Sequence, residues 1–240
     1  MISLLDTIKL LLDTNLKYNQ DAVNKILNCL ENNIAELDNE TLVFILILYK
    51  IGYKNFNSNN TKYMSFLQKA ADVGNIDAIC NLGNVYRYGK RVPKNIDKAI
   101  ELFKKAADLG NTYAMKKLGY IYIKDKGVKN IEKATEYFKK AADLDDIEGM
   151  NNLAYMYINY DKDKKNKAIE LFTKAANLGN IDATINLCYM YIEGKGVEKN
   201  IDKAKEYFKK AKDLFLLNPI RNKKRKLEEI IYDESKKHKK

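Results

Sequence analysis

The sequence predicts an all-α protein, a right-handed superhelical solenoid of stacked antiparallel helix pairs. The first observation is a heptapeptide that occurs five times, as KAADVGN, KAADLGN, KAADLDD, KAANLGN and KAKDLFL, starting at positions 69, 105, 140, 174 and 210. The second is that each period contains two segments with the apolar spacing of an amphipathic helix. The third is the composition, because 46% of the residues are hydrophobic and only 2 of 240 are proline. Helix pairs this short enclose no core alone, so neighbouring pairs must stack.

The first helix of one period lies between residues 75 and 89. Five apolar side chains fall on one face of it when each residue turns the helix by about 100°. They are Ala78, Ile79, Leu82, Val85 and Tyr86. We expect this face to be buried.

The second helix of the same period has recognisable ends. Asn95 suits the N-cap, and Gly110 suits the C-terminal end, where a left-handed residue is common. Apolar residues recur between them at three- and four-residue spacing; these are Ile96, Ala99, Ile100, Phe103, Ala106 and Ala107. The heptapeptide is therefore predicted to end the second helix and to turn the chain into the next repeat.

The chain divides into three regions without a flexible linker between them. Residues 1–39 are predicted to form an N-terminal helical cap. Residues 40–213 contain five repeats, of which the first is degenerate because it keeps mainly its second helix. The fourth is degenerate because Ala154 stands where the two preceding repeats have Gly83 and Gly119, and NYDKDKKNK replaces the glycine-containing loop. Residues 214–240 are predicted to form a C-terminal capping helix and a basic tail.

The repeats share a longer pattern with a known family. LGNVY, LGYIY, LAYMY and LCYMY lie in the first helices, from positions 82, 118, 153 and 187, and KNIDKA, KNIEKA and KNIDKA start the second helices at 94, 129 and 199. With the KKAADxGN ending, this pattern resembles the Sel-one-like repeat family, which is related to the tetratricopeptide repeats. The resemblance covers residues 40–213. It implies a solenoid whose first helices line a concave groove.

The residues give no sign of catalytic chemistry. His238 is the only histidine and lies in a lysine-rich tail, so no histidine base is available to activate a Ser or Cys nucleophile. Asp145, Asp146 and Glu148 are placed to begin a helix, where acids suit the dipole, rather than to form a metal site. EGKGVEKN at 193–200 lacks the preceding strand and the GK[ST] ending of a phosphate loop. We predict that the protein is not an enzyme and holds no cofactor or metal.

Several features predict a cytoplasmic protein. The opening MISLLDTIKLLLDTN lacks the basic start and unbroken apolar core of a signal peptide. The longest apolar run, within residues 42–49, is too short to span a membrane. Cys29, Cys80 and Cys188 are isolated, which fits buried thiols in a reducing compartment.

The net charge of +11 raises the alternative of nucleic-acid or anionic-surface binding. Much of the lysine, however, follows glutamate at i,i+4 in the second helices, as on an ordinary solvated face; the pairs are Glu101/Lys105, Glu136/Lys140, Glu170/Lys174 and Glu206/Lys210. Only Lys50, Arg87 and Lys116 fall near the opposite face of the first helices. We therefore do not expect a nucleic-acid partner.

The tail, residues 218–240, carries nine Lys or Arg and four acidic residues. It has two interpretations. A terminal helix could close the open end of the solenoid, with Leu227, Ile230 and Ile231 packing inward. The basic clusters at 223–226 and 236–240 could instead act in nuclear import or contact an anionic surface.

The face of the first helices opposite the buried stripe is the candidate binding surface. Tyrosines and isoleucines recur there, although polar side chains are expected on an outward face. The candidate protein-binding residues are Lys116, Tyr120, Ile123, Tyr155, Ile158, Ile185, Tyr189 and Ile192. A second interpretation is that these side chains fill the seams between neighbouring first helices.

The predicted function is a protein-interaction module, an adaptor or scaffold that binds a peptide or protein partner in the concave groove of the solenoid. The alternative is a nucleic-acid or anionic-surface binding protein that uses its basic repeats and tail. The sequence leaves the partner's identity and the oligomeric state open.

Overall fold

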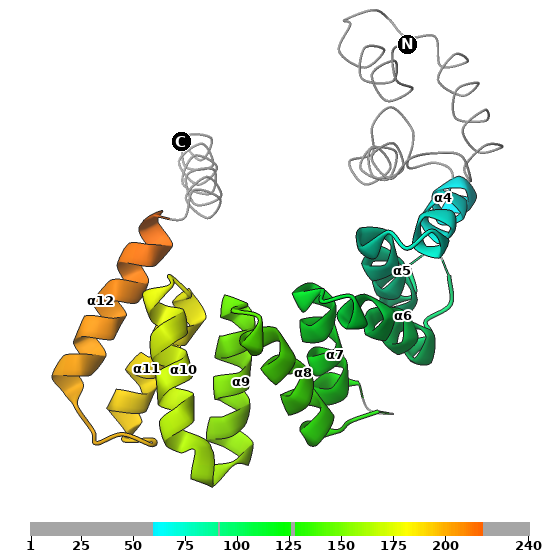
Figure 1. Ribbon diagram of the computed structural model, residues 1–240. Coiled ribbons are helices and arrows are strands. Elements are labelled where there is room, and N and C mark those ends of the chain that lie inside the picture. The colour runs from blue at the N-terminus through cyan, green and yellow to red at the C-terminus, as the bar shows by residue number, and fades with distance from the viewer. Residues whose placement is uncertain (1–59, 91, 126–127, 218–240) are drawn as a thin grey trace, which may run out of the picture. The chain divides into compact units, whose positions relative to one another are not determined.

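A computed structural model describes residues 60–90, 92–125 and 128–217 (Figure 1). These residues form nine α-helices, one short 3₁₀ helix and no strand, which confirms the predicted all-α class. The elements are α4 (Asn60–Asp72), α5 (Ile76–Tyr88), α6 (Ile96–Asp108), α7 (Thr112–Lys124), α8 (Ile131–Asp143), α9 (Ile147–Tyr160), η3 (Lys162–Lys164), α10 (Lys165–Asn177), α11 (Ile181–Glu193) and α12 (Ile201–Leu217).

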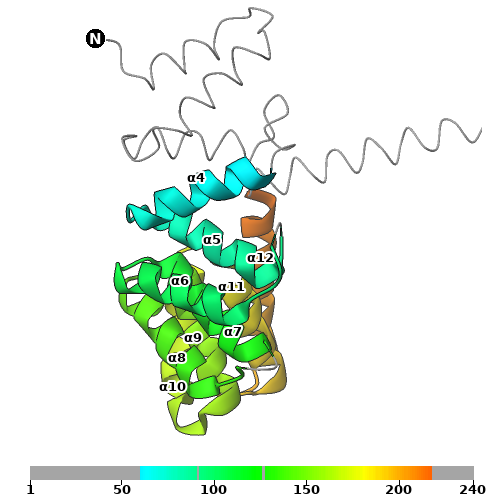
Figure 2. The same cartoon turned by 90° about the vertical axis from the view of Figure 1, so that its right-hand side faces the viewer.

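The chain forms two compact units, divided between Leu118 and Gly119 within α7. In unit 1, α4 packs on α5, and α5 pairs with α6 (Figure 2). In unit 2, α8 packs on α9, and the contacts continue in chain order through α10 and α11 to α12. The predicted cap at 1–39, the first half of the first predicted repeat and the tail at 218–240 lie outside the described residues. Helix α4 stands where the second helix of that first repeat is predicted.

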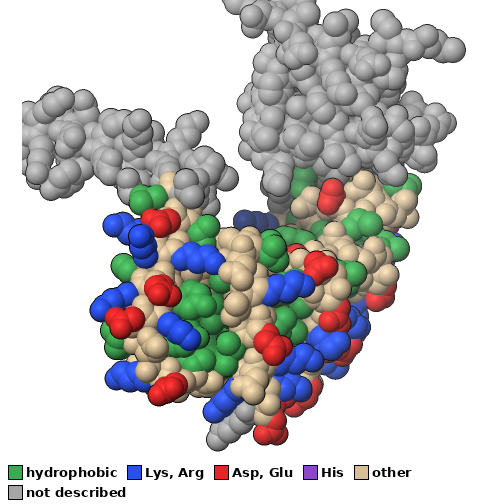
Figure 3. Space-filling view, turned by 60° about the vertical axis from the view of Figure 1, so that its left-hand side comes forward, with side chains coloured by type: hydrophobic (Ala, Val, Ile, Leu, Met, Phe, Trp, Pro, Cys, Tyr) green, Lys and Arg blue, Asp and Glu red, His purple; other side chains and the backbone are tan. Residues whose placement is uncertain are grey.

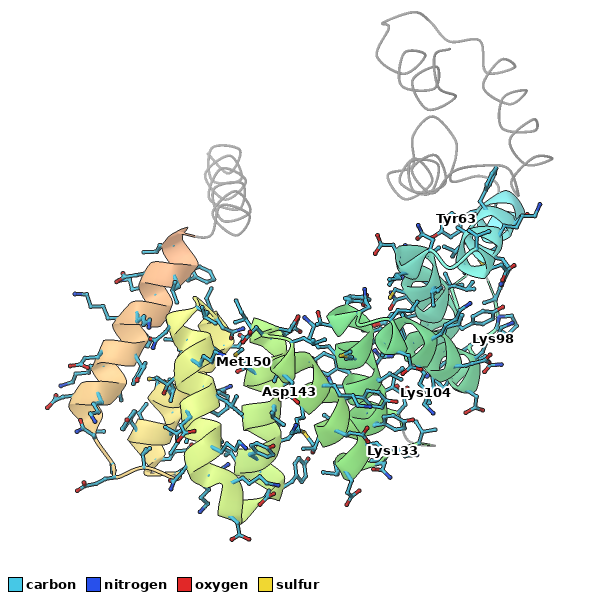
Figure 4. All side chains as sticks on the ribbon, viewed as in Figure 1. Tyr63, Lys98, Lys104, Lys133, Asp143 and Met150 are labelled. Atoms are coloured by element: carbon cyan, nitrogen blue, oxygen red, sulfur yellow. The ribbon has the colours of Figure 1, made fainter. Side chains whose placement is uncertain are left out.

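The core consists of the predicted apolar faces. In α5, Ala78, Ile79 and Leu82 are completely buried, whereas Tyr86 is half-buried. Every second helix from α6 to α10 buries one phenylalanine and several alanines. The phenylalanines are Phe103, Phe138 and Phe172, at 0%, 1% and 2% exposure. Met150 of α9, labelled in Figure 4, is also buried, whereas the labelled Lys98, Lys104 and Lys133 are exposed.

Glycines in the first helices let these phenylalanine rings lie directly against the helix backbone. A Cβ atom added at Gly119 would lie 2.6 Å from the Phe138 ring, and one added at Gly83 would lie 3.0 Å from Phe103. Successive repeats also approach closely, because a Cβ atom at Gly149 of α9 would lie 2.8 Å from Ala141 of α8. The helices pack at distances that larger side chains would not permit.

The heptapeptide acts as one unit that ends a helix and begins the next. Gly110 has φ +82°, its N–H donates to the Ala107 carbonyl, and the Asn111 N–H donates to the Ala106 carbonyl at 3.1 Å. These bonds form a Schellman motif. The Asn111 side chain then caps α7 by accepting from the Ala114 N–H at 2.8 Å. Two adjacent residues therefore satisfy backbone groups at both helix ends.

The same turn recurs at Gly74, Asp145 and Gly179. Asp145, in the copy KAADLDD, is the only non-glycine residue with positive φ among the described residues, at +57°. Asp146 caps α9 in place of asparagine, accepting from the Gly149 N–H at 2.7 Å. In the last copy, KAKDLFL, Phe215 takes the glycine position and α12 continues to Leu217. The turn therefore tolerates Asp but is absent where Phe replaces the glycine.

The degenerate loop of the fourth predicted repeat is short and helical. Helix α9 continues to Tyr160, and η3 follows it directly. Asp161 accepts a hydrogen bond from the Lys164 side chain at 2.6 Å. The loop without glycine therefore still connects two antiparallel helices.

Replacing Gly119 with alanine should lower the free energy of unfolding by about 1–2 kcal/mol. Overpacking a filled core costs about 1–3 kcal/mol, and alanine returns up to about 1 kcal/mol through its helix propensity. Gly83→Ala should cost less because its added Cβ has slightly more room. Urea unfolding followed by circular dichroism measures both changes, and an equal or greater loss at Gly83 would contradict the packing argument.

Asp145→Gly should stabilise the protein by about 0.5–1 kcal/mol, because glycine adopts the left-handed conformation without the penalty that a Cβ imposes. The change removes an ion pair between Asp145 and Lys174, 2.8 Å long, but both side chains are exposed and such pairs contribute little. Gly179→Asp, at the equivalent position of the next repeat, is the reciprocal control and should destabilise. Melting temperatures that move in the same direction for the two variants would refute this account.

Candidate functional site

The candidate face of the first helices carries a hydrogen-bonded seam in unit 2. The Tyr120 hydroxyl of α7 donates to Glu148 Oε1 of α9 at 3.1 Å and accepts from Asn152 Nδ2 at 2.8 Å. Its ring meets the Phe138 ring of α8 edge-to-face, with centroids 5.4 Å apart. Tyr120, which belongs to α7, thus contacts both α8 and α9. These contacts are the ones expected if the side chain fills the seam between neighbouring first helices.

The environment of Tyr120 changes its acidity. Burial raises the pKa of its phenol to about 12 from the usual 10.0, and the nearby Glu148 carboxylate also raises it because a second negative charge would be repelled. The hydrogen bond from Asn152 acts in the opposite direction. The hydroxyl therefore keeps its proton throughout the physiological range and remains a donor to Glu148.

Polar contacts also join other neighbouring first helices. In unit 1, Asn84 Nδ2 donates to the Tyr113 hydroxyl at 2.9 Å, linking α5 to α7. In unit 2, Asn186 Nδ2 donates to Asn151 Oδ1 at 3.1 Å, linking α11 to α9. Asn84 is equivalent to Tyr120 in the repeat, so this position contacts the following repeat in both units.

The eight predicted residues do not share one environment. Lys116 belongs to unit 1 and is half-buried, as are Tyr120 and Ile123 in unit 2. Ile158 is buried, close to where Gly196 of the next repeat lies. Four residues on α9 and α11 are exposed: Tyr155 at 51%, Ile185 at 38%, Tyr189 at 59% and Ile192 at 42%. The other four predicted residues are therefore less accessible to solvent than these.

Sequence reasoning missed an exposed aromatic residue on α12. Phe208 of α12 is 65% exposed, although its equivalents in the earlier second helices are buried. A signal was present in the sequence, because Cys188 stands at the position of Gly83 and Gly119. Gly83 and Gly119 lie directly against the phenylalanine ring of their own repeat, whereas the Cys188 Sγ donates to the Ala204 carbonyl of α12 at 3.3 Å.

Figure 3 shows hydrophobic side chains gathered on one face of the described part of the protein, with Lys, Asp and Glu side chains around them.

Lysine side chains also contact aromatic rings. In each repeat a lysine Nζ lies 4.5–5.5 Å from the centroid of a tyrosine ring, within the range of a cation–π interaction. The pairs are Lys98/Tyr86, Lys133/Tyr122, Lys164/Tyr157 and Lys203/Tyr191. These tyrosine faces are covered by the protein's own lysines.

The described residues offer little reactive chemistry. No three His, Cys, Asp or Glu side chains within the described part of the chain are grouped to hold a metal ion. Burial raises the pKa of the Cys80 thiol to about 12 and also raises the pKa of Cys188. Both thiols are therefore protonated at neutral pH and are weak nucleophiles. None of the helices in the described ranges is long and apolar enough to cross a membrane.

Paired helices of 13 to 17 residues that repeat along the chain and contact one another through side chains define a helical repeat protein. The family model described as Sel1 repeat matches residues 76–111, 112–146, 147–180 and 181–214, more than half of the chain. The chain belongs to the Sel1 repeat family, which confirms the predicted resemblance. Sel1 repeat proteins generally mediate protein–protein interactions, and their fold is typically a non-catalytic scaffold. The first predicted repeat, residues 40–74, lies outside the matched residues.

Solved structures show the same fold. The protein c5321, described as a protective antigen in uropathogenic Escherichia coli strains, is 28% identical with a TM-score of 0.67. The match covers 78% of this chain but only 40% of the length of c5321. A Sel1 repeat protein from Oxalobacter formigenes is 24% identical with a TM-score of 0.66, over 79% of this chain and 76% of the other. Comparison with curated proteins gave no match.

Tyr120→Phe should reduce the loss of stability at alkaline pH. Because the folded-state pKa lies above the unfolded one, the protonated phenol contributes stability below pH 10 that is lost as the pH rises to about 12. The variant should therefore be less stable than the wild type at pH 8, and the difference should shrink towards pH 12. Urea unfolding at several pH values measures it. Tyr155→Phe, at the exposed equivalent position, should match the wild type, and a constant deficit for Tyr120→Phe would contradict the prediction.

Proposed function

We propose that this chain is an adaptor or scaffold that binds a protein partner through the exposed apolar side chains of α9 and α11. The partner surface consists of Tyr155, Ile185, Tyr189 and Ile192. The observation that carries the proposal is the exposure of Tyr155 in the interior of unit 2. Three further helices, α10 to α12, follow α9 in the chain, and none of them covers the Tyr155 ring. An aromatic ring that stays exposed inside a stack of helices supports a binding role.

Tyr155 is equivalent to Tyr120, so the two residues provide an internal comparison. Glu148 and Asn152 of the following repeat hold the Tyr120 hydroxyl. The residue equivalent to Asn152 is Asn186, and it instead donates to Asn151. The Tyr155 ring is therefore left about half exposed. A tyrosine offers a large rigid contact area and a polar hydroxyl, which is why such residues are common hot spots.

The three other members of the partner surface add apolar area on α11. Ile185, Tyr189 and Ile192 lie at spacings of four and three residues, so they share one side of the helix. A partner segment with apolar side chains would remove this area from water, and hydrophobic burial would then contribute to affinity. Lys116, Tyr120, Ile123 and Ile158 are not included because they are buried or half-buried.

The nucleic-acid alternative has less support. Single-stranded nucleic acid is bound by stacking bases on exposed aromatic faces beside free cations. In each repeat, one tyrosine face is already covered by a lysine of the same chain. We therefore favour a protein partner, and binding that fell steeply with salt would favour the alternative.

Affinity capture with the full chain, followed by measurement with the purified captured protein, tests the proposal. Tyr155→Ala together with Tyr189→Ala should weaken binding by about 2 kcal/mol or more if these residues are hot spots. The matched control is Tyr160→Ala, which removes a tyrosine of similar exposure, 55%, from the end of α9. Calorimetry should show normal affinity for the control. Normal affinity for the double variant would refute the proposed partner surface.

A further inference from the structure

One column of the first helices changes from a cation in unit 1 to apolar side chains in unit 2. Arg87 of α5 stands at the repeat position that carries Ile123, Ile158 and Ile192 in the later first helices. The Arg87 side chain is half-buried, and its guanidinium lies 5.4 Å from the centroid of the Tyr88 ring. The two units therefore offer different chemistry at equivalent positions.

Two lysines lie beside Arg87 and Tyr88. The Lys90 Nζ is 5.8 Å from the centroid of the same tyrosine ring. Lys94 lies next to the backbone of Gly89, because a Cβ atom added at Gly89 would be 3.2 Å from the Lys94 Cβ. Both lysines are exposed, and Tyr88 is 54% exposed. We name Arg87, Tyr88, Lys90 and Lys94 the basic patch.

Backbone hydrogen bonds fix the two ends of the connection that carries the basic patch. Gly89 ends α5 with φ +66°, and its N–H donates to the Val85 carbonyl. The Asn95 N–H donates to the Tyr86 carbonyl at 2.9 Å. The Asn95 side chain then caps α6 by accepting from the Lys98 N–H at 2.9 Å. The side chains of the basic patch therefore start from backbone held against α5 and α6.

The positive charge of this region is not balanced within its own repeat. The described residues between 86 and 98 include four Lys or Arg and one acid, Asp97. The equivalent residues of the last repeat, 191–203, include three lysines and three acids. Helix α6 as a whole also carries three lysines and three acids. The excess of cations is therefore local to the end of α5 and the connection that follows it.

The geometry favours an acidic protein segment over a nucleic acid as the occupant of the basic patch. Single-stranded nucleic acid is held by stacking bases on open aromatic faces along a continuous row of cations. Here Arg87 and Lys90 already lie over the Tyr88 ring, and the charges of α6 are balanced. A short acidic segment needs no such row, because each carboxylate can accept a charge-assisted hydrogen bond from Arg or Lys. The exposed part of the Tyr88 ring adds apolar contact area.

We propose that the basic patch binds an acidic segment of a protein, one with clustered Asp or Glu side chains. The proposal goes beyond the proposed function, because the basic patch belongs to unit 1 and the partner surface on α9 and α11 belongs to unit 2. The two surfaces share no residue. Either one can therefore fail its test without affecting the other.

A fluorescein-labelled octaglutamate peptide is the probe, and fluorescence anisotropy at low ionic strength measures its binding to the full chain. Lys90→Gln together with Lys94→Gln should weaken binding about five-fold or more, because two exposed charge pairs are lost. The matched control is Lys104→Gln together with Lys105→Gln on α6, where both lysines are also exposed and Lys104 is labelled in Figure 4. The control makes the same change in net charge and should bind nearly as well as the wild type.

A charge-preserving variant separates charge from other effects of the substitutions. Lys90→Arg together with Lys94→Arg keeps both cations and should bind octaglutamate like the wild type. Circular dichroism should show the same helix content for all variants, because the lysines exchanged are exposed. Loss of binding in the arginine variant would overturn the proposal, since positive charge would then not be the property that the peptide recognises.

Three further results would overturn the proposal. The first is no measurable binding of octaglutamate to the wild type. The second is an equal loss in the glutamine variant and its α6 control, because the attraction would then come from the net charge of the whole chain. The third is tighter binding of a labelled single-stranded oligothymidylate of the same net charge through Lys90 and Lys94, which would make the basic patch a nucleic-acid site.

Discussion

The structure depends on one packing constraint: each helix pair buries its phenylalanine and alanines only with help from the next pair. Phe138 illustrates it, because the ring lies against Gly119 within its own repeat while α9 packs on the same helix through Gly149. The next helix must therefore return at a fixed place. The Schellman turn and the adjacent N-cap provide that return in two residues, which explains why the heptapeptide recurs with so little change.

The same constraint explains why some apolar side chains are left exposed. A surface that one repeat uses to bind the next is apolar or carries polar groups with partners, and it becomes available wherever the succession of repeats changes. At α12, Phe215 removes the glycine of the turn, Cys188 replaces the glycine under the phenylalanine, and Phe208 is left in solvent. The change at α12 therefore leaves exposed an aromatic side chain whose equivalents in the earlier repeats are buried.

Charge has a more local role than the net value of +11 suggests. Lysines on the second helices stack on tyrosine rings, or pair with nearby acids such as Glu136 with Lys140 at 2.8 Å. These interactions are exposed and individually weak. They keep the outer surface polar while the aromatic rings beneath them pack on the helices. The protein can therefore be strongly basic although much of its lysine serves its own surface.

The sequence by itself determined the helix pairs, their caps and the buried phenylalanines and alanines, because these depend on short-range periodicity and on capping residues next to each helix end. It also indicated the family. The tertiary structure decided which members of the tyrosine and isoleucine columns are exposed. Tyr120 and Tyr155 have the same residue type and repeat position, but only Tyr120 is held by Glu148 and Asn152. Those partners lie about thirty residues away, and local periodicity does not encode which side chain of the next repeat reaches back.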